Sequence, residues 1–156
     1  MVGRLELAIL IGLQASGKST FRRRFLGDYV VVSKDDFRNA RNRQRRQMHL
    51  VNQALSVGRC VVVDNTNPSR DEWEPLLDAA HAHAAAAVGY WFPPDLSGAL
   101  TRNAARKDRD RVPDVGLYAT LKRLRRPQLS DGFDRLCEVR FDGRGGFMIQ
   151  PMAEKG

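Results

Sequence analysis

Residues 12–20 carry the clearest chemical signal in the sequence. They read Gly-Leu-Gln-Ala-Ser-Gly-Lys-Ser-Thr and fit G-x-x-x-x-G-K-[ST], the pattern of a phosphate-binding P-loop. Glycines in such a loop let backbone N–H groups turn toward phosphate oxygens, and the following helix N-terminus adds partial positive charge. We expect Lys18 to reach the β- and γ-phosphates of ATP and the Ser19 hydroxyl to hold Mg²⁺. The residues predicted to bind ATP in this stretch are Gly12, Gln14, Ala15, Ser16, Gly17, Lys18, Ser19 and Thr20.

Asp64 directly follows the apolar run Cys-Val-Val-Val at 60–63. An acid at the end of a buried strand is typical of the Walker B position. There it holds Mg²⁺ through a water molecule, or it positions the serine and lysine of the P-loop. We expect one of these roles for Asp64. The alternative is that its carboxylate caps the next helix.

Two neighbouring carboxylates, Asp35 and Asp36, follow the β-branched run at 29–32. One of them can accept the proton of an attacking hydroxyl group or orient that group, and we assign this role to Asp35. The alternative, that they cap the next helix, is the one we favour for Asp36. Arg38 lies one helical turn beyond Asp35 on the same face, so it can bind an anionic group of the same acceptor. Exposure to solvent without a ligand is the alternative for Arg38. It is the interpretation we favour for the remaining arginines of this stretch, which are Arg41, Arg43, Arg45 and Arg46.

Further arginines lie in a helix predicted over 96–106, ahead of a densely charged segment. Arg102 and Arg106 are four residues apart, which places them on one face of that helix. In small P-loop kinases a closing lid brings arginines onto the transferring phosphoryl group, whose negative charge is spread over its oxygens. We expect Arg106 to act there as a catalytic residue, together with Lys18 and Asp35, and Arg102 to contact ATP beside it. The alternative for each lid arginine is solvation or non-specific phosphate contact.

Strand and helix patterns alternate along the chain. The runs predicted as strands are 5–11, 29–32, 60–64 and 86–92, with one or two short closing strands at 138–141 and 146–149. Helices are predicted over 21–26, 36–56, 69–85, 96–106 and 115–124. This order predicts an α/β protein with the P-loop NTPase fold. It would have a mainly parallel central sheet of four to five strands, flanking helices and a helical lid that carries arginines. The P-loop, Asp35, Asp64 and the lid would then meet at the carboxyl ends of the strands.

The length and composition of the chain limit the classes of protein to which it can belong. The length of 156 residues fits a single domain with a substantial core. A net charge of +8 favours polyanionic partners, the alternative being a basic surface without a ligand. Cys60 and Cys137 match no disulfide or metal spacing, and no signal-peptide pattern precedes the first strand, so we expect a cytoplasmic protein. No apolar run reaches 18 residues, so we expect no membrane span.

Together these motifs resemble the kinase domain of polynucleotide 5′-hydroxyl kinases. The resemblance runs in order from about residue 5 to residue 133. The stretches that carry it are 12–20, 33–38, 63–68, 102–106, 112–113 and 127–133. It implies a single P-loop kinase domain at 1–150, followed by a C-terminal tail at 151–156.

The resemblance also implies an activity, which is transfer of the γ-phosphate of ATP to 5′-OH ends of DNA or RNA, with Mg²⁺, in nucleic-acid repair. Asp35 would be the general base on the 5′-OH group, and Arg38 would bind the 3′-phosphate of the acceptor. Arg106 would contact the ATP phosphates with Arg102 beside it, and Val112 would pack on the terminal nucleotide.

Some positions depart from the family. Ala15 stands where relatives often have glycine, and Ser33 and Lys34 replace a common Asn-Arg pair. The chain lacks an Asp-x-Asp-Gly-Thr phosphatase motif, so we expect no 3′-end processing. Two other functions stay open. One is a P-loop kinase of a small metabolite or nucleoside, and the other is a nucleotide-dependent nucleic-acid-binding module without transferase activity.

Overall fold

A six-stranded sheet forms the centre of the computed structural model, which describes residues 4–108 and 110–152. The strands follow the order β2-β3-β1-β4-β5-β6, and all neighbours are parallel except the antiparallel pair β5 and β6. Their bounds are β1 (Glu6–Ile11), β2 (Val30–Val32), β3 (Val61–Val63), β4 (Ala86–Trp91), β5 (Arg135–Phe141) and β6 (Phe147–Pro151). The predicted mainly parallel α/β fold is confirmed. The predicted strand count of four to five is too low, because β5 and β6 both join the sheet.

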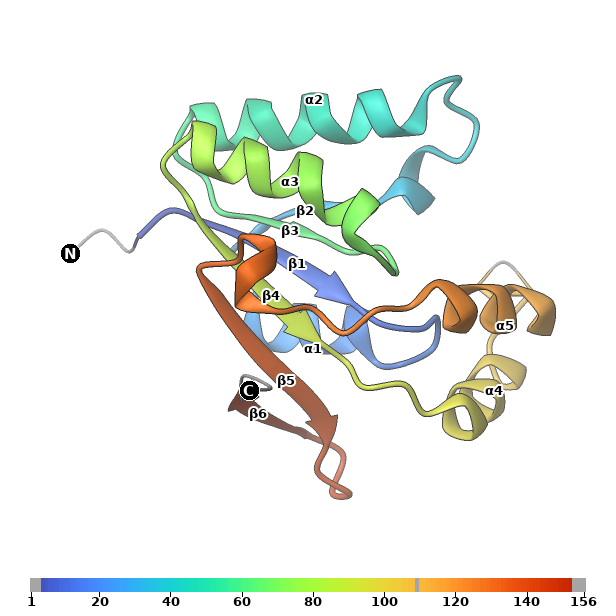
Figure 1. Cartoon of the computed structure of the whole chain (residues 1–156). Coiled ribbons are helices and arrows are strands. Elements are labelled where there is room, and N and C mark those ends of the chain that lie inside the picture. The colour runs from blue at the N-terminus through green and yellow to red at the C-terminus, as the bar shows by residue number, and fades with distance from the viewer. Residues whose placement is uncertain (1–3, 109, 153–156) are drawn as a thin grey trace.

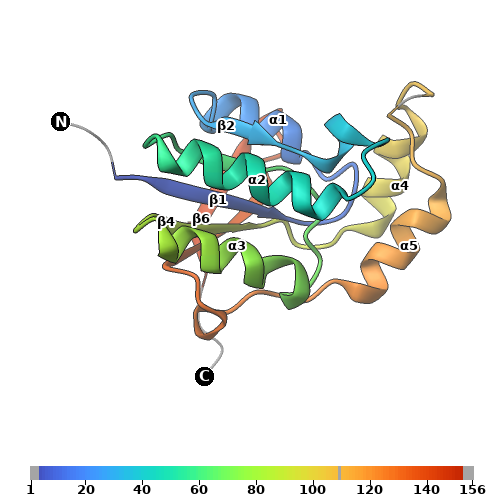
Figure 2. The same cartoon turned by 90° about the horizontal axis from the view of Figure 1, so that it is seen from above.

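Helices cover both faces of the sheet and close one end of it. Their bounds are α1 (Lys18–Phe25), α2 (Arg43–Ser56), α3 (Arg70–Ala82), α4 (Leu96–Ala104) and α5 (Asp114–Arg123), with short 3₁₀ helices η1 (Lys34–Phe37) and η2 (Leu129–Asp131). In Figure 1, α2 and α3 lie on one face of the sheet and α1 lies on the other. Seen from above in Figure 2, α4 and α5 lie together beyond the carboxyl ends of β1 and β4.

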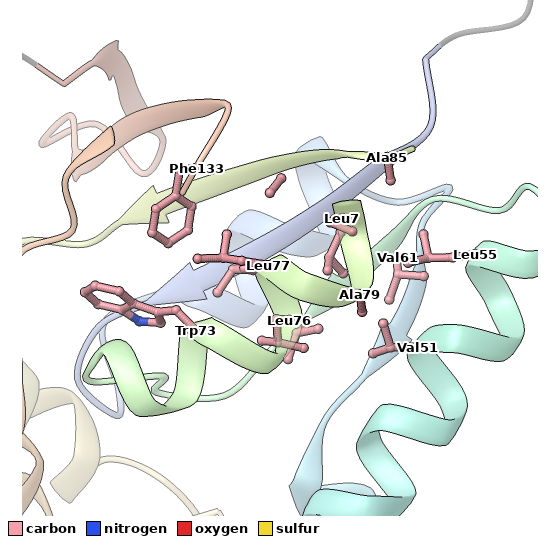
Figure 3. Close-up of a cluster of buried hydrophobic side chains, with 14 of the residues drawn as sticks. Leu7, Val51, Leu55, Val61, Trp73, Leu76, Leu77, Ala79, Ala85 and Phe133 are labelled. Atoms are coloured by element: carbon pink, nitrogen blue, oxygen red, sulfur yellow. The ribbon is translucent and has the colours of Figure 1, made fainter. Parts of the chain in front are cut away.

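The apolar pattern of β1 explains this layering. Because successive strand side chains alternate between faces, Leu7 and Ile9 pack toward α2 and α3, whereas Ala8 and Leu10 pack toward α1. Figure 3 shows Trp73 and Leu77 of α3 in the first of these cores. The core thus fixes the strand ends from which the loops 12–17, 33–42 and 64–69 begin.

Two predicted helices differ from the structure in ways that matter for the site. The helix predicted over 36–56 is split into η1 and α2, since each part has its own cap. Ser33 Oγ accepts a hydrogen bond from Asp35 N at 3.3 Å, and Asn42 Oδ1 accepts one from Arg45 N at 2.9 Å. The helix predicted over 96–106 ends at Ala104, so Arg106 lies in the loop beyond it.

The C-terminal strand crosses the predicted boundary between residues 150 and 151. β6 runs to Pro151, and Met152 N donates a hydrogen bond to Leu136 O at 3.1 Å. Residues 1–3 of the predicted domain and 153–156 of the predicted tail lie outside the described residues. No helix in the described part of the chain combines the length and apolar character needed to cross a membrane.

Candidate active site

The P-loop connects β1 to α1 and needs glycine at two close approaches. A Cβ atom on Gly12 would lie 2.8 Å from Phe92 Cβ. Gly17 has a φ of +89°, and a Cβ there would lie 2.8 Å from Phe141 Cζ. Gly12 N donates to Thr66 O at 3.0 Å, which ties the loop to the segment after β3. The spacing of the glycines in the motif therefore reflects both backbone conformation and packing.

Ala15 is the one non-glycine residue of the P-loop with positive φ, at +57°, and it is buried. The left-handed region costs an L-residue about 1–2 kcal/mol, which gives a physical reason for glycine at this position in relatives. The Ala15 carbonyl accepts a hydrogen bond from Arg102 Nε. The loop thus holds a strained residue whose carbonyl is fixed by a lid arginine.

Lys18 is buried beneath the loop. Its Nζ donates to Gly12 O at 3.0 Å, to Leu13 O, and to Ser16 Oγ at 3.3 Å. Burial lowers the pKa of Lys18 to about 8, against the opposing effect of the Asp64 carboxylate. Arg106 lowers this pKa further and Asp35 raises it. Charged groups of the lid and of η1 therefore both lie close enough to act on this ammonium group of the P-loop.

The Asp64 carboxylate lies beside the P-loop hydroxyl. Ser19 Oγ donates to Asp64 Oδ2 at 2.8 Å, and Arg22 Nε donates to the same oxygen at 3.0 Å. Asp64 does not cap α3, because that helix begins with a capping box between Ser69 and Glu72.

A magnesium ion fits this pair. Asp64 Oδ1 accepts no hydrogen bond from the described residues, and Asp64 borders the same cavity as Ser19. Histidine, cysteine and carboxylate side chains of the described residues form no group of three that would hold a metal alone. Mg²⁺ in nucleotide sites needs no such group, since it keeps several waters and takes phosphate oxygens as ligands. Ser19 would hold it directly and Asp64 through water.

Asn65 holds η1 in place. Its Oδ1 accepts a hydrogen bond from Lys34 N at 2.9 Å, and its amide donates to Gln47 Oε1 of α2 at 2.7 Å. Since Ser33 caps η1, the Asp35 carboxylate is not used as a cap, and none of the described residues donates to it. Arg38 directly follows η1 with helical backbone angles, three residues beyond Asp35, so the two side chains project from similar sides.

A buried asparagine shapes the lid. Asn103 is fully buried, and its side-chain amide bonds both the carbonyl and the N–H group of Val112, the latter at 2.9 Å. Arg106 N donates to Asn103 O at 3.1 Å, and Arg106 Nη1 donates to Asp110 O at 3.3 Å. This compact loop, rather than a continued helix, orients Arg106.

These elements enclose one cavity of about 650 Å³ at the carboxyl ends of the strands. The predicted site residues that line it are Gln14, Ala15, Ser16, Lys18, Ser19, Thr20, Asp35, Arg38, Asp64, Arg106 and Val112. The structure thus brings the predicted donor and acceptor residues to one place. Gly12 and Gly17 shape the loop beside it, through the close approaches described above.

Arg102 faces a different space from Arg106. It lines a neighbouring hollow of about 230 Å³, and its Cζ lies 4.7 Å from the centre of the Phe141 ring. The expectation that both arginines share a helix face is wrong, because α4 ends between them. Ser16 borders both spaces, so the hollow adjoins the phosphate loop.

Sequence reasoning missed several residues of this region. Phe141 and Phe147 stack with ring centres 5.4 Å apart and line the hollow beside Arg102. Arg22 pairs with Asp64, and Asn103 fixes the lid. The sequence offers a weak signal for Phe141, an aromatic residue at the end of a strand. Asn103 falls inside a motif stretch but carries no signal of what it bonds.

A comparison with protein families decides the classification. The sequence model of the AAA domain family matches residues 7–127, which include the P-loop, η1 and the lid. The chain belongs to the AAA domain family. Its fold and P-loop are of the kinase type.

A viral protein is similar to most of this chain. A protein of Acanthamoeba polyphaga mimivirus, described as a bifunctional polynucleotide phosphatase/kinase, is 27% identical over 144 residues. The match covers 87% of this chain and 33% of the viral protein, so the chain spans about a third of that relative.

Solved structures of two kinases share the fold. A gluconokinase from Sinorhizobium meliloti matches with a TM-score of 0.62 and 18% identity, covering 88% of this chain and 84% of its own. A fungal RNA kinase matches with a TM-score of 0.67 and 13% identity, covering 89% and 39%. The two kinases act on different kinds of substrate, so the fold alone does not identify the acceptor.

The buried ammonium of Lys18 predicts a pH-dependent stability difference. Its pKa is about 8 in the folded state and 10.5 in the reference state, so the unfolded chain binds more protons between these values. Stability should therefore rise with pH through this window in the wild type. Relative to that of Lys18→Met, the free energy of unfolding of the wild type should rise by about 2 kcal/mol between pH 7 and pH 10, as measured by urea unfolding at each pH. A constant difference between the two proteins would contradict the burial of a charged Lys18.

Proposed function

We propose that this chain is an ATP-dependent polynucleotide 5′-hydroxyl kinase that acts on DNA or RNA ends in nucleic-acid repair. The observation that carries the proposal is that Asp35 of η1 and Arg38 directly after η1 line the same cavity as Lys18. A carboxylate and a guanidinium at this spacing fit an acceptor that has both a hydroxyl group and a nearby phosphate. The basic charge of the chain and its likeness to the mimivirus protein support a polynucleotide acceptor.

In the proposed reaction, the 5′-oxygen of the acceptor attacks the γ-phosphorus of ATP. The new bond joins the 5′-oxygen to that phosphorus, the bond from the phosphorus to the β–γ bridging oxygen breaks, and ADP leaves. The hydroxyl proton passes to the Asp35 carboxylate. Arg38 binds the 3′-phosphate of the terminal nucleotide, and Val112 packs against that nucleotide at the cavity wall.

In this reaction, Lys18 and Arg106 stabilise the negative charge on the transferring phosphoryl group. Both border the cavity, and Arg106 lies close enough to Lys18 to add to the lowering of its pKa by burial. Donors aimed at the equatorial oxygens of a loose phosphoryl transition state lower its energy without reorganisation. Mg²⁺ held by Ser19 and Asp64 would neutralise charge on the β- and γ-phosphates.

The hollow beside the P-loop offers a place for the base of ATP. Phe141 presents an aromatic face there, and Arg102 already stacks over it at 4.7 Å. A purine ring bound in this hollow would contact the aromatic and guanidinium groups that line it. Arg102 therefore stays assigned to ATP, on the base rather than beside Arg106 on the phosphates.

The first test is transfer of labelled γ-phosphate from ATP to a 5′-OH oligonucleotide in the presence of Mg²⁺. We expect label on the 5′ end with the wild type, and a 100- to 10,000-fold lower kcat with Asp35→Asn, the usual range for a lost general base. ATP binding, followed by thermal shift, should stay within about twofold because Asp35 contacts only the acceptor. Asp36→Asn is the matched control and should keep its kcat. Absence of end label from the wild type would refute the proposal.

A second prediction concerns Arg38. Arg38→Ala should raise the KM for a nucleoside 3′-phosphate about 10- to 100-fold, the value of a lost charge-assisted hydrogen bond. The KM for the nucleoside without its 3′-phosphate should change little. Steady-state kinetics on the two acceptors make the comparison. An equal loss on both would show that Arg38 does not read this phosphate.

A small metabolite or nucleoside is the second candidate acceptor. The observation in its favour is the gluconokinase likeness, which covers nearly the whole of that enzyme, whereas the fungal RNA kinase is covered over 39%. Measurement of ATP consumption with a metabolite panel and with 5′-OH oligonucleotides separates the candidates. A mononucleoside or sugar used more efficiently than any oligonucleotide would favour the second.

A further inference from the structure

Three exposed arginines beside η1 are not used by the mechanism above. Arg41 lies in the loop before α2, and Arg43 and Arg46 lie in its first turn. We call these three residues the arginine patch. None of the ion pairs found among the described residues involves them. Their positive charge is therefore not neutralised by side chains in the described part of the chain.

Contacts place the patch on the flank of η1, the short helix that carries Asp35 and is directly followed by Arg38. The Cζ atom of Arg46 lies 5.7 Å from the centre of the Phe37 ring. Burial lowers the pKa of Lys34, and Arg43 is close enough to lower it further. Lys34 and Phe37 are the first and last residues of η1. Figures 1 and 2 show η1 and the start of α2 at the same end of the molecule as the lid helices.

This arrangement is unfavourable for the helix itself. The first turn of α2 contains no acidic residue, although negative side chains are the ones that stabilise a helix N-terminus. Neighbouring guanidinium groups also repel one another. A bound polyanion would remove both penalties, so the charge is suited to a ligand more than to stability of the fold.

The two flanks of η1 differ in charge. A recess of about 450 Å³ continues from the main cavity and is lined by Asp35, Asp36, Arg38, Asn39 and Asp110. Its carboxylates repel phosphate groups, whereas the patch on the other flank of η1 attracts them. A strand whose first phosphate is at Arg38 is thereby directed toward α2.

Building on the proposed function, we propose that the arginine patch binds backbone phosphates of the acceptor strand beyond the one held by Arg38. The substrate class is then an oligonucleotide several nucleotides long rather than a mononucleotide. Affinity for the acceptor should rise with its length until the patch is filled, and this added affinity should depend on salt.

The double variant Arg43→Gln/Arg46→Gln tests the proposal. A control with equal charge loss is Arg45→Gln/Arg59→Gln. Arg45 projects about 100° away from Arg46 around the helix, and Arg59 follows the other end of α2. KM is measured for a nucleoside 3′-phosphate and for 5′-OH oligonucleotides of increasing length. Unfolding midpoints confirm that the variants fold, and Arg43→Gln alone serves if loss of the Phe37 contact unfolds the double variant.

We expect the KM of the wild type to fall at least tenfold from the nucleoside 3′-phosphate to an 8-mer. The patch variant should lose most of this fall in KM, while the control variant keeps it. In the patch variant, kcat and the KM for the nucleoside 3′-phosphate should stay within about twofold of the wild-type values. The slope of log KM against log salt for the 8-mer should drop by about 1 in the patch variant. Equal behaviour of the two variants, or an unchanged length dependence in the patch variant, would overturn the proposal.

Direct binding separates this proposal from the proposed function. Fluorescence anisotropy with a 3′-labelled 5′-OH 8-mer needs no turnover. If the wild type phosphorylates no acceptor, the kinase assignment fails, and the patch is still judged by weaker 8-mer binding of the patch variant relative to the control. If both variants bind the 8-mer as the wild type does, the patch proposal fails whatever the activity.

Discussion

A buried ammonium group is the constraint on which this site depends. Lys18 is inside the P-loop, where burial of a charge is expensive, and backbone carbonyls of Gly12 and Leu13 compensate it. These carbonyls hold the ammonium against the cavity that Lys18 lines. Binding of a triphosphate would exchange neutral carbonyl partners for anionic oxygens, a stronger interaction at low dielectric. The loop is therefore already arranged to bind phosphate, and the burial of the Lys18 charge that this requires lowers the stability of the fold.

The remaining parts of the site are held around this group by hydrogen bonds between loops. Thr66 O fixes Gly12, Asn65 fixes η1, and Asn103 fixes the lid. The first two bonds join segments that follow different strands of the sheet, whereas the Asn103 bond lies within the segment that follows β4. Since the parallel strands end at one edge, these short links suffice to bring carboxylate, guanidinium and ammonium groups into one cavity. The structure thus separates a rigid sheet, which sets position, from loops that carry the chemistry.

Much of the fold and some of the site could be predicted from sequence. The P-loop motif and the apolar strands are local signals, and they located β1, β3, β4 and the start of α1 to within a few residues. The break between η1 and α2 was missed because the whole stretch 36–56 is compatible with a helix, and only the caps Ser33 and Asn42 reveal it. The end of α4 was missed for a similar reason, since it depends on the tertiary contact of Asn103 with Val112.

Contacts between segments that are far apart in the sequence limit how much of the chemistry of the site can be predicted from the sequence pattern. The stacking of Arg102 on Phe141 joins residues 39 positions apart and redirects an arginine that sequence spacing assigns to the phosphates. The pairing of Arg22 with Asp64 could not be predicted either, because these two residues are also far apart in the sequence. Residue type predicted which groups bind phosphate, whereas packing decided which space each group faces.

The central claim is that donor and acceptor sites share one cavity, which Lys18, Asp35 and Arg38 all line. The most direct measurement is calorimetric binding of a bisubstrate analogue, in which a nucleoside 3′-phosphate is joined through its 5′-oxygen to the phosphate chain of ATP. The account predicts at least tenfold tighter binding than ATP, and loss of this gain in Arg38→Ala with ATP affinity unchanged. An analogue that binds no better than ATP, or whose affinity is indifferent to Arg38, would contradict it.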